Sequence, residues 1–133
     1  MGVHALSVLL DTHAALWLVQ GDERLSAAAR ERISPLDRDG ICIPDLMLFE
    51  LALLATRQRV VITEPLEPFL RDFSGHFRVL PVDAGIAAKA VELSLPQADP
   101  FDRLFVATAI RHKLPLVTRD REIRGSGLVA TIW

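Results

Sequence analysis

Short aliphatic runs and longer apolar stretches take turns along the chain, and their lengths distinguish strands from helices. A short aliphatic run bounded by turn-forming residues predicts a buried strand, and a longer apolar stretch behind a capping residue predicts a helix. The predicted strands cover residues 5–10, 40–43, 77–82, 114–118 and 128–132. The predicted helices cover residues 14–19, 27–33, 46–56, 65–73, 84–94 and 100–113. Residues 60–63 fit an extended piece or a loop, and residues 119–123 predict a polar turn.

The alternation of strands and helices indicates the fold class. Helical crossovers between successive strands place those strands parallel in one sheet, with helices on both faces. We therefore expect an α/β protein, a single three-layer α/β/α domain over residues 1–133 with a central, mostly parallel sheet. Ligands of such sheets bind beyond the carboxyl ends of the strands, so polar residues at that edge are the first functional candidates.

The composition is that of a globular protein in a reducing compartment. Half of the 133 residues are hydrophobic and 24% are charged, which excludes a disordered chain. No apolar run approaches the roughly 20 residues of a membrane helix, and no basic segment precedes the first apolar run as in a signal peptide. The single cysteine, Cys42, lies in an apolar run and is expected in the core. We expect a cytoplasmic protein without membrane contact.

Two carboxylates lie in the first turn of the helix predicted at residues 100–113. Asp99 suits the N-cap and Pro100 suits the first helical position, where proline has no N–H to lose. Asp102 follows, and nearly every residue from 101 to 110 is apolar. A helix that is apolar on nearly all sides belongs inside a domain, so Asp102 faces a partner or a cavity. The alternative is that both aspartates only cap the helix.

Two further aspartates follow predicted strands. Asp11 comes directly after the first strand, and Asp120 follows the fourth strand after two residues. Both therefore lie at the edge of the sheet where ligands bind. The alternatives are that Asp11 caps the helix that follows it and that Asp120 belongs to an ordinary polar turn.

Glu50 is the only charged residue from Leu46 to Ala55, where nine apolar residues surround it. Such a helix is expected to be buried on most sides. A buried carboxylate is costly unless it is paired, protonated or bound to a metal. The alternative is a narrow solvent-facing stripe with Arg57 or Arg59 as a partner of Glu50.

Convergence of these acids would require a cation. Carboxylates close together repel and raise one another's pKa, and a hard divalent cation removes that problem. Oxygen ligands without histidine or cysteine favour Mg²⁺ or Mn²⁺ over zinc. Carboxylate-held Mg²⁺ with open water positions suits phosphate chemistry. With a net charge of −2, any contact with nucleic acid needs a local patch.

The chain resembles the PIN-domain ribonucleases, specifically the VapC-type toxins of bacterial toxin–antitoxin pairs. The resemblance is carried, in order, by residues 9–18 (LLDTHAALWL), 49–52 (FELA), 99–104 (DPFDRL) and 116–120 (LVTRD). In that family four acids bind Mg²⁺ or Mn²⁺ and RNA is cut. The resemblance implies that these acids are Asp11, Glu50, Asp102 and Asp120, with Asp11 and Asp102 as the most direct ligands. It also implies an antitoxin that covers the site and a homodimer.

The surroundings of the four acids add further expectations. The family often has small hydroxyl residues ahead of the glutamate, whereas this chain has residues 44–48 (PDLML), where Asp45 is a possible helix cap. Arginines suit bidentate phosphate contacts, so three of them are candidates for RNA binding, with balance of the acidic cluster or a surface position as the alternative. These are Arg103, Arg119 and Arg121. His13 is expected to pack near Trp17.

Two other functions compete with a metal-dependent endoribonuclease. A signalling receiver domain is also a small α/β fold with Mg²⁺-binding aspartates, but it expects adjacent acids after the first strand and a lysine after the last. Here Asp11 stands alone and no lysine follows Lys113. The other alternative is a PIN fold that has lost catalysis and only binds a partner, which has no need for a buried Glu50.

Overall fold

The computed structural model describes residues 6–133 and contains a sheet of five parallel strands. The strands are β1 (Val8–Leu10), β2 (Ile41–Pro44), β3 (Arg78–Leu80), β4 (Leu116–Val117) and β5 (Thr131–Ile132). Their order across the sheet is β3-β2-β1-β4-β5. The predicted parallel sheet is confirmed. Of the first predicted strand, Ala5 lies outside the described residues and Leu6 lies in a turn.

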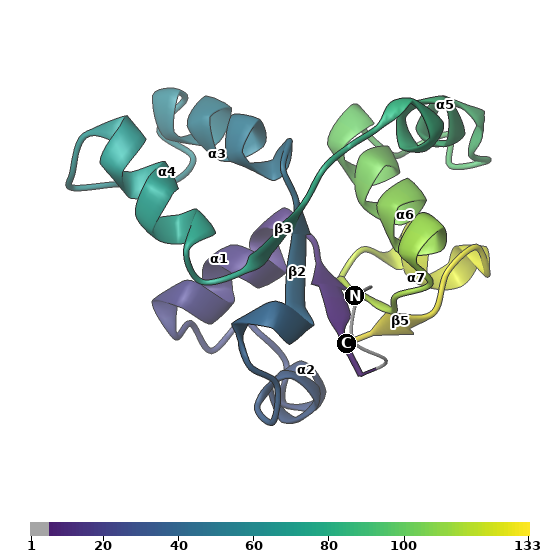
Figure 1. Ribbon diagram of the computed structural model, residues 1–133, viewed down its shortest axis with the longest axis horizontal. Helices are drawn as coiled ribbons and strands as arrows, with labels where there is room; N and C mark the ends of the chain where they lie inside the picture. The colour runs from purple at the N-terminus through teal and green to yellow at the C-terminus, as the bar shows by residue number, and fades with distance from the viewer. Residues whose placement is uncertain (1–5) are drawn as a thin grey trace.

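Helices cover both faces of this sheet, as a three-layer fold requires. They are α1 (Thr12–Gln20), α2 (Ala27–Ile33), the 3₁₀-helix η1 (Arg38–Gly40), α3 (Met47–Thr56), α4 (Leu66–Ser74), α5 (Ala84–Glu92), α6 (Pro100–His112) and α7 (Arg121–Ser126). Parallel crossovers are right-handed, so connections that run toward β3 and connections that run toward β5 lie on opposite faces. Figure 1 shows this division, with α1, α3 and α4 on one side of the strands and α5 and α6 on the other.

The order of the strands reverses its direction between β1 and β4: the chain adds β2 and β3 on one side of β1, and β4 and β5 on the other. Leu9 pairs with Leu116 and Leu10 with Val117, and the N–H of Asp11 donates to the carbonyl of Val117 over 3.1 Å. The carboxyl ends of β1 and β4 therefore lie side by side. This is the topological switch point, where open parallel sheets bind their ligands.

The core lies between the sheet and its helices. The three residues of β1 are fully buried, as expected for a parallel strand covered on both faces. Phe73 and Phe105 fill the space on the two sides of the sheet, from α4 and α6. Cys42 is in the core as predicted, and burial raises the pKa of its thiol to about 11, so it is unreactive at neutral pH.

Residues 121–126 differ from the prediction, because they form helix α7 where a polar turn was expected. One oxygen of the Asp120 carboxylate accepts from the N–H of Ile123 over 2.9 Å and caps the helix. Gly127 ends it with a φ of 71°, a left-handed conformation that favours glycine. The helix has only six residues, too few for a helical period to appear in the sequence. Residues 60–63 form a loop.

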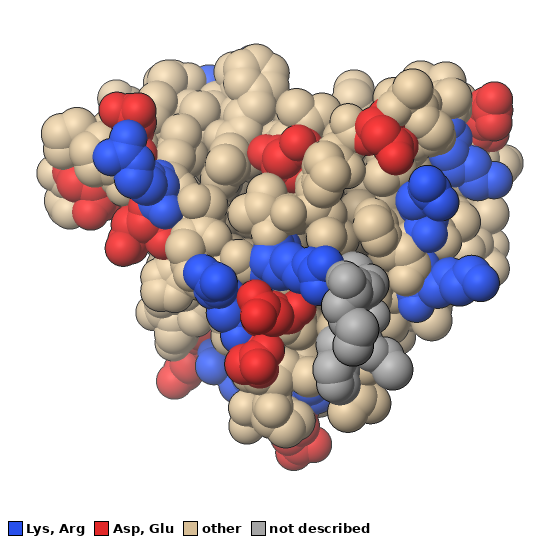
Figure 2. Space-filling model, in the orientation of Figure 1, with Lys and Arg blue, Asp and Glu red and all other residues tan. Residues whose placement is uncertain are grey.

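Helix α3 is more exposed than its apolar sequence predicts. Only Met47 and Leu51 of this helix are buried, whereas Phe49 is 58% exposed. The expectation that the helix is buried on most sides is therefore wrong, and an apolar surface faces solvent. Figure 2 shows few charged side chains on the surface over α3. No helix within residues 6–133 is long and apolar enough to cross a membrane.

Candidate metal and nucleic-acid site

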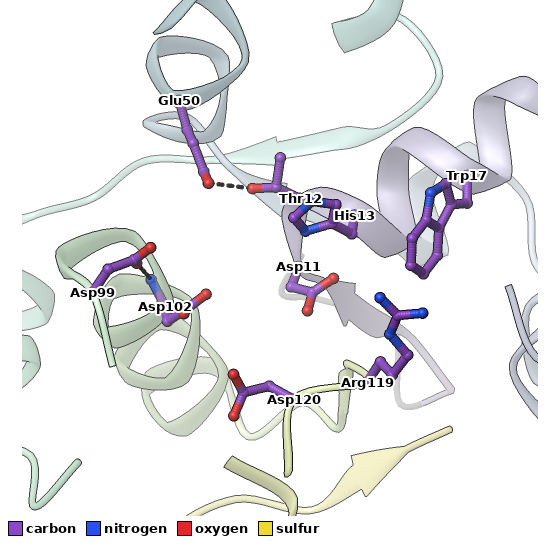
Figure 3. Close-up of a pocket in the computed structure, with 9 residues that line it drawn as sticks. All are labelled: Asp11, Thr12, His13, Trp17, Glu50, Asp99, Asp102, Arg119 and Asp120. Carbon is purple, nitrogen blue, oxygen red and sulfur yellow. Dashed lines mark hydrogen bonds between the residues drawn. The ribbon is translucent and has the colours of Figure 1, made fainter. Parts of the chain in front are cut away.

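A pocket of about 240 Å³ opens beside the carboxyl ends of β1 and β4. Its lining combines all four predicted acids with a fifth carboxylate and a single arginine. The lining residues are Asp11, Thr12, His13, Trp17, Glu50, Asp99, Asp102, Arg119 and Asp120. Figure 3 shows the carboxylates of Asp11, Asp102 and Asp120 around a common space. Acids that are up to 109 positions apart in the sequence therefore share one site.

Asp11 joins β1 to α1 and is 9% exposed. Its Oδ1 accepts from the N–H of Ala14 over 2.9 Å and caps α1. The hydroxyl of Thr118, at the end of β4, donates a second hydrogen bond to the carboxylate. Asp11 is thus fixed by both central strands.

Glu50 projects from α3 toward the start of α1. The hydroxyl of Thr12 donates a hydrogen bond to Oε1 of Glu50, and this contact joins the two helices at the pocket (Figure 3). Glu50 is half-buried, and in the part of the chain that the structure describes it forms no ion pair with Arg57 or Arg59. The solvent-stripe alternative is therefore not what is observed.

Asp99 and Asp102 open α6 with different roles. Asp99 is the N-cap, as predicted, and its Oδ1 accepts from the N–H of Asp102 over 2.8 Å. Asp102 lies in the first helical turn, and its carboxylate faces the pocket (Figure 3). Asp99 also lines the pocket, so the site has a fifth carboxylate that the sequence analysis assigned only to capping.

Three aspartates of this protein both cap a helix and line the pocket, so the two roles do not exclude each other. The aspartates at positions 11, 99 and 120 each cap a helix through Oδ1. All three also line the pocket. A carboxylate has two oxygens, and the cap bond uses one of them, so the fold fixes each side chain without removing it from the site.

The electrostatics of the pocket oppose full ionisation of its acids. Burial, and to a smaller extent the charges of the other four pocket carboxylates, together raise the pKa of Asp102 to about 7. Burial also raises the pKa of Asp11 and of Glu50, while hydrogen bonds from Thr118 and Thr12 act in the opposite direction. Asp102 therefore lies within the electrostatic range of the four other carboxylates of the pocket. Such a site favours binding of a cation.

These raised pKa values predict a stability that depends on pH. The folded protein holds the Asp102 proton up to a pH of about 7, whereas an unfolded chain releases it near 3.8. Between these values the folded state binds more protons, so the free energy of unfolding falls as pH rises through this window. We expect the melting temperature in EDTA to fall from pH 4 to 7, and Asp102→Asn to flatten this fall. Parallel curves for the two proteins would contradict the assignment.

The three candidate arginines have different surroundings. Arg119 lines the pocket, as predicted for a residue near the acids. Arg121 is exposed at the start of α7. Arg103 points elsewhere: its guanidinium donates to the carbonyls of Ala90 (3.2 Å), Leu93 (2.9 Å) and Leu95 (2.7 Å). These bonds hold the end of α5 and occupy the guanidinium, so they favour a structural role for Arg103, while its contact with RNA stays a prediction.

Two local expectations have clear outcomes. His13 packs near Trp17 as predicted, with ring centroids 5.6 Å apart. Asp45 does not cap α3 through its side chain. Its Oδ1 instead accepts from the N–H of Val82 over 3.3 Å and connects the end of β2 to the segment after β3.

The donor set of the pocket fits a hard divalent cation. Its potential ligands are mainly carboxylate oxygens, the type that Mg²⁺ and Mn²⁺ prefer. Among residues 6–133 no three histidine, cysteine or acidic side chains form a ready metal cluster. The space suits an ion that keeps its own waters, since a volume of 240 Å³ exceeds by several times the roughly 30 Å³ of one water.

Two threonines hold the acids in place and were not among the predicted site residues. The hydroxyl of Thr12 donates a hydrogen bond to Glu50. Thr118 forms a hydrogen bond with the carboxylate of Asp11, and its Oγ1 accepts from the N–H of Asp120 over 3.1 Å. A threonine beside each strand-end aspartate was the available signal. The contacts of these threonines depend on which strands are neighbours in the sheet, and the sequence alone does not give the order of the strands.

Comparison with known proteins places the chain in a family. The model of the "PIN domain" family matches residues 8–125. Ribonuclease VapC22 of Mycobacterium tuberculosis is 40% identical over 120 residues, which cover 89% of this chain and 90% of that protein. A family match over most of the chain excludes the receiver-domain alternative.

Solved structures show the same fold. A DNA-bound VapBC from Salmonella typhimurium has a TM-score of 0.68 at 20% identity and covers 94% of this chain and 96% of its own. A toxin–antitoxin complex from Klebsiella pneumoniae has a TM-score of 0.66 at 23% identity and covers 94% and 97% of the two chains. At these identities the likeness is one of fold.

Proposed function

Because the chain belongs to the PIN-domain family, we propose that it is a metal-dependent endoribonuclease and the toxin of a toxin–antitoxin pair. One observation carries the proposal: four acids from separate parts of the sequence, Asp11, Glu50, Asp102 and Asp120, line one pocket at the switch point of the sheet. A pocket with several carboxylates and raised pKa values is suited to a cation and, through it, to phosphate chemistry.

We propose Mg²⁺ as the cation, with Mn²⁺ as a substitute. Mg²⁺ in proteins commonly keeps several waters and uses one or two carboxylates directly. Asp11 and Asp102 would bind the ion most directly, and Glu50 and Asp120 would complete the set of acids that hold it. When bound, the ion supplies a water of lowered pKa and compensates charge on the transferred phosphoryl oxygens.

The residues of the chain prepare this site before RNA arrives. The N–H of Ala14 holds Oδ1 of Asp11, so the carboxylate is already oriented in the pocket before the RNA binds. Thr12 holds Glu50 across the interface of α1 and α3. Arg119 provides a positive group on the opposite wall from Asp102, suited to a phosphate of the RNA (Figure 3).

Removal of the cation tests the proposal directly. Purified protein is expected to cleave a labelled single-stranded RNA in MgCl₂ and to lose at least about 100-fold of that rate in excess EDTA, because phosphoryl charge is then uncompensated. Restoration by MnCl₂ is the control for irreversible damage. Equal cleavage in EDTA would contradict metal dependence, and absence of cleavage with tight RNA binding would favour the catalytically silent alternative.

We further propose a homodimer and an antitoxin partner, in the cytoplasm where a free cysteine stays reduced. The solved relatives include toxin–antitoxin complexes. Support on this chain is an apolar surface that we call the α3–α5 groove, a hollow of about 340 Å³. It is defined by Leu46, Val82, Ala87, Ala90, Val91, Pro100, Arg103 and Leu104, of which only Arg103 is charged. Val91 is 78% exposed, and exposed apolar patches mark interaction sites.

A charge in the α3–α5 groove is expected to disrupt the homodimer. In Val91→Glu, formation of the dimer would bury an unpaired carboxylate. The dimer dissociation constant should therefore rise at least about tenfold. Sedimentation at several concentrations measures this. Val61→Glu is the matched control, because Val61 is 83% exposed in the loop after α3 and does not line the groove. A dimer of unchanged strength in Val91→Glu would exclude this face.

A further inference from the structure

Arg119 lies among five carboxylates and yet pairs with none of them. It lines the same pocket as Asp11, Glu50, Asp102 and the two other acids. Within residues 6–133, however, its guanidinium takes part in no ion pair and no hydrogen bond. A long, exposed cation beside unpaired acids ordinarily moves onto one of them, so another contact must hold it.

That contact is the indole of Trp17. The guanidinium carbon of Arg119 lies 4.8 Å from the centroid of the Trp17 ring, within the range of a cation–π interaction. Figure 3 shows the guanidinium beneath the ring, turned away from Asp102. The ring is 3% exposed, so it is a wall of the pocket and not a platform for a base.

Trp17 is itself held in place by two other rings. The rings of His13 and Trp133 pack against it at 5.6 and 6.0 Å. A second guanidinium, that of Arg24, lies 5.1 Å from its centroid. Arg24 is already engaged, because two of its nitrogens donate to the carboxylate of Asp22 over 3.1 and 2.8 Å. The indole is therefore a fixed support.

A guanidinium that contacts an aromatic face keeps its in-plane N–H groups available, and these match two oxygens of a phosphate. We propose that Trp17 is a positioning residue of the RNA site, which holds Arg119 away from the carboxylates and presents it to an RNA phosphate. This inference rests on the proposed function for its substrate class. It adds a reason why an acidic pocket can accept a polyanion: its arginine is kept free for the phosphate.

RNA binding without cleavage tests the inference. The probe is a fluorescein-labelled single-stranded RNA of about ten nucleotides, measured by anisotropy in MgCl₂ with Asp11→Asn in every protein to prevent turnover. Arg119→Ala is expected to weaken binding roughly 10- to 100-fold, the range for a hydrogen bond to a charged group. It should also reduce the salt slope by about 0.7, as for one lost phosphate contact to a single strand.

Trp17→Leu is expected to weaken binding at least about fivefold in the protein that has Arg119, by releasing its guanidinium. It should have no further effect when Arg119 is already alanine, and Trp17→Phe, which keeps an aromatic face, should recover part of the loss. Arg24→Ala is the matched control, because it removes the same charge from the same ring but outside the pocket, and binding should stay within about twofold.

Three results would overturn the inference: equal losses for the two arginine variants, an undiminished effect of Trp17→Leu in the Arg119→Ala protein, or unchanged binding in Arg119→Ala. If Trp17→Leu does not fold, Trp17→Phe gives the same comparison with a smaller effect. Failure of this inference can be distinguished from failure of the nuclease proposal. Protein with an intact Asp11 that binds RNA through Arg119 but never cleaves it would refute the activity and leave the role of Trp17 intact.

Discussion

Asp102→Asn is expected to abolish RNA cleavage, with a loss of at least about 100-fold, while the protein stays folded. The carboxylate of Asp102 faces the pocket, and the cap of α6 is supplied by Asp99 instead. The substitution removes a charge that does not cap the helix, so we expect the fold to be retained. Without metal, the variant should be more stable than the original protein above pH 7, since a buried and repelled charge is gone.

Asp11→Asn provides a second test with the same expected loss of cleavage. An asparagine keeps a side-chain oxygen that accepts from the N–H of Ala14, so the cap of α1 survives. Initial rates on a labelled RNA, with melting curves for folding, measure both variants. Asp39→Asn is the control, because it removes an acid whose side chain is 72% exposed and which does not line the pocket. Normal cleavage by both folded pocket variants would refute the proposed activity.

Arg103→Ala is expected to lower the free energy of unfolding by about 3 kcal/mol. The variant removes a charged donor from three backbone carbonyls that follow or end α5, those of Ala90, Leu93 and Leu95. These carbonyls are partly buried and lose partners that water does not fully replace. For a domain of this size the melting temperature should fall by roughly 10 °C.

Arg111→Ala is the matched control for Arg103, because it removes an arginine from the exposed side of the same helix. Its expected effect on unfolding is within about 0.5 kcal/mol. Urea unfolding of both variants measures the difference. In folded Arg103→Ala, RNA affinity should be unchanged at low temperature. A stable variant with weakened RNA binding would restore the original expectation that this arginine contacts phosphate.

The fold was predictable because its signals are local. Aliphatic runs between turn-forming residues marked β1 and β2, and Asp99-Pro100 marked the start of α6. Helix α7 was missed because six residues contain fewer than two turns, although Asp120 and Gly127 at its ends are ordinary capping residues. The exposure of α3 was missed because an apolar sequence does not distinguish a core from a surface that binds a partner.

Four of the five acids that line the pocket were predictable from the sequence. Each lies either in an apolar helix, where burying a charge costs free energy, or after the carboxyl end of a strand, where parallel sheets bind ligands. Glu50 was identified by its nine apolar neighbours and Asp11 by its place after β1. What could not be predicted were contacts between distant segments. Thr12 with Glu50 and Arg119 with Trp17 form only when strand order and helix packing are set. The bonds of Arg103 could not be predicted for the same reason, since its partners lie on and after another helix.

A crystal of the protein soaked in Mn²⁺ would show whether these carboxylates share one divalent cation. We expect an anomalous peak within about 2.2 Å of carboxylate oxygens of both Asp11 and Asp102, the distance typical of a hard cation of this size. The peak should disappear in Asp102→Asn. A peak outside this pocket, or no peak at saturating Mn²⁺, would refute a shared cation.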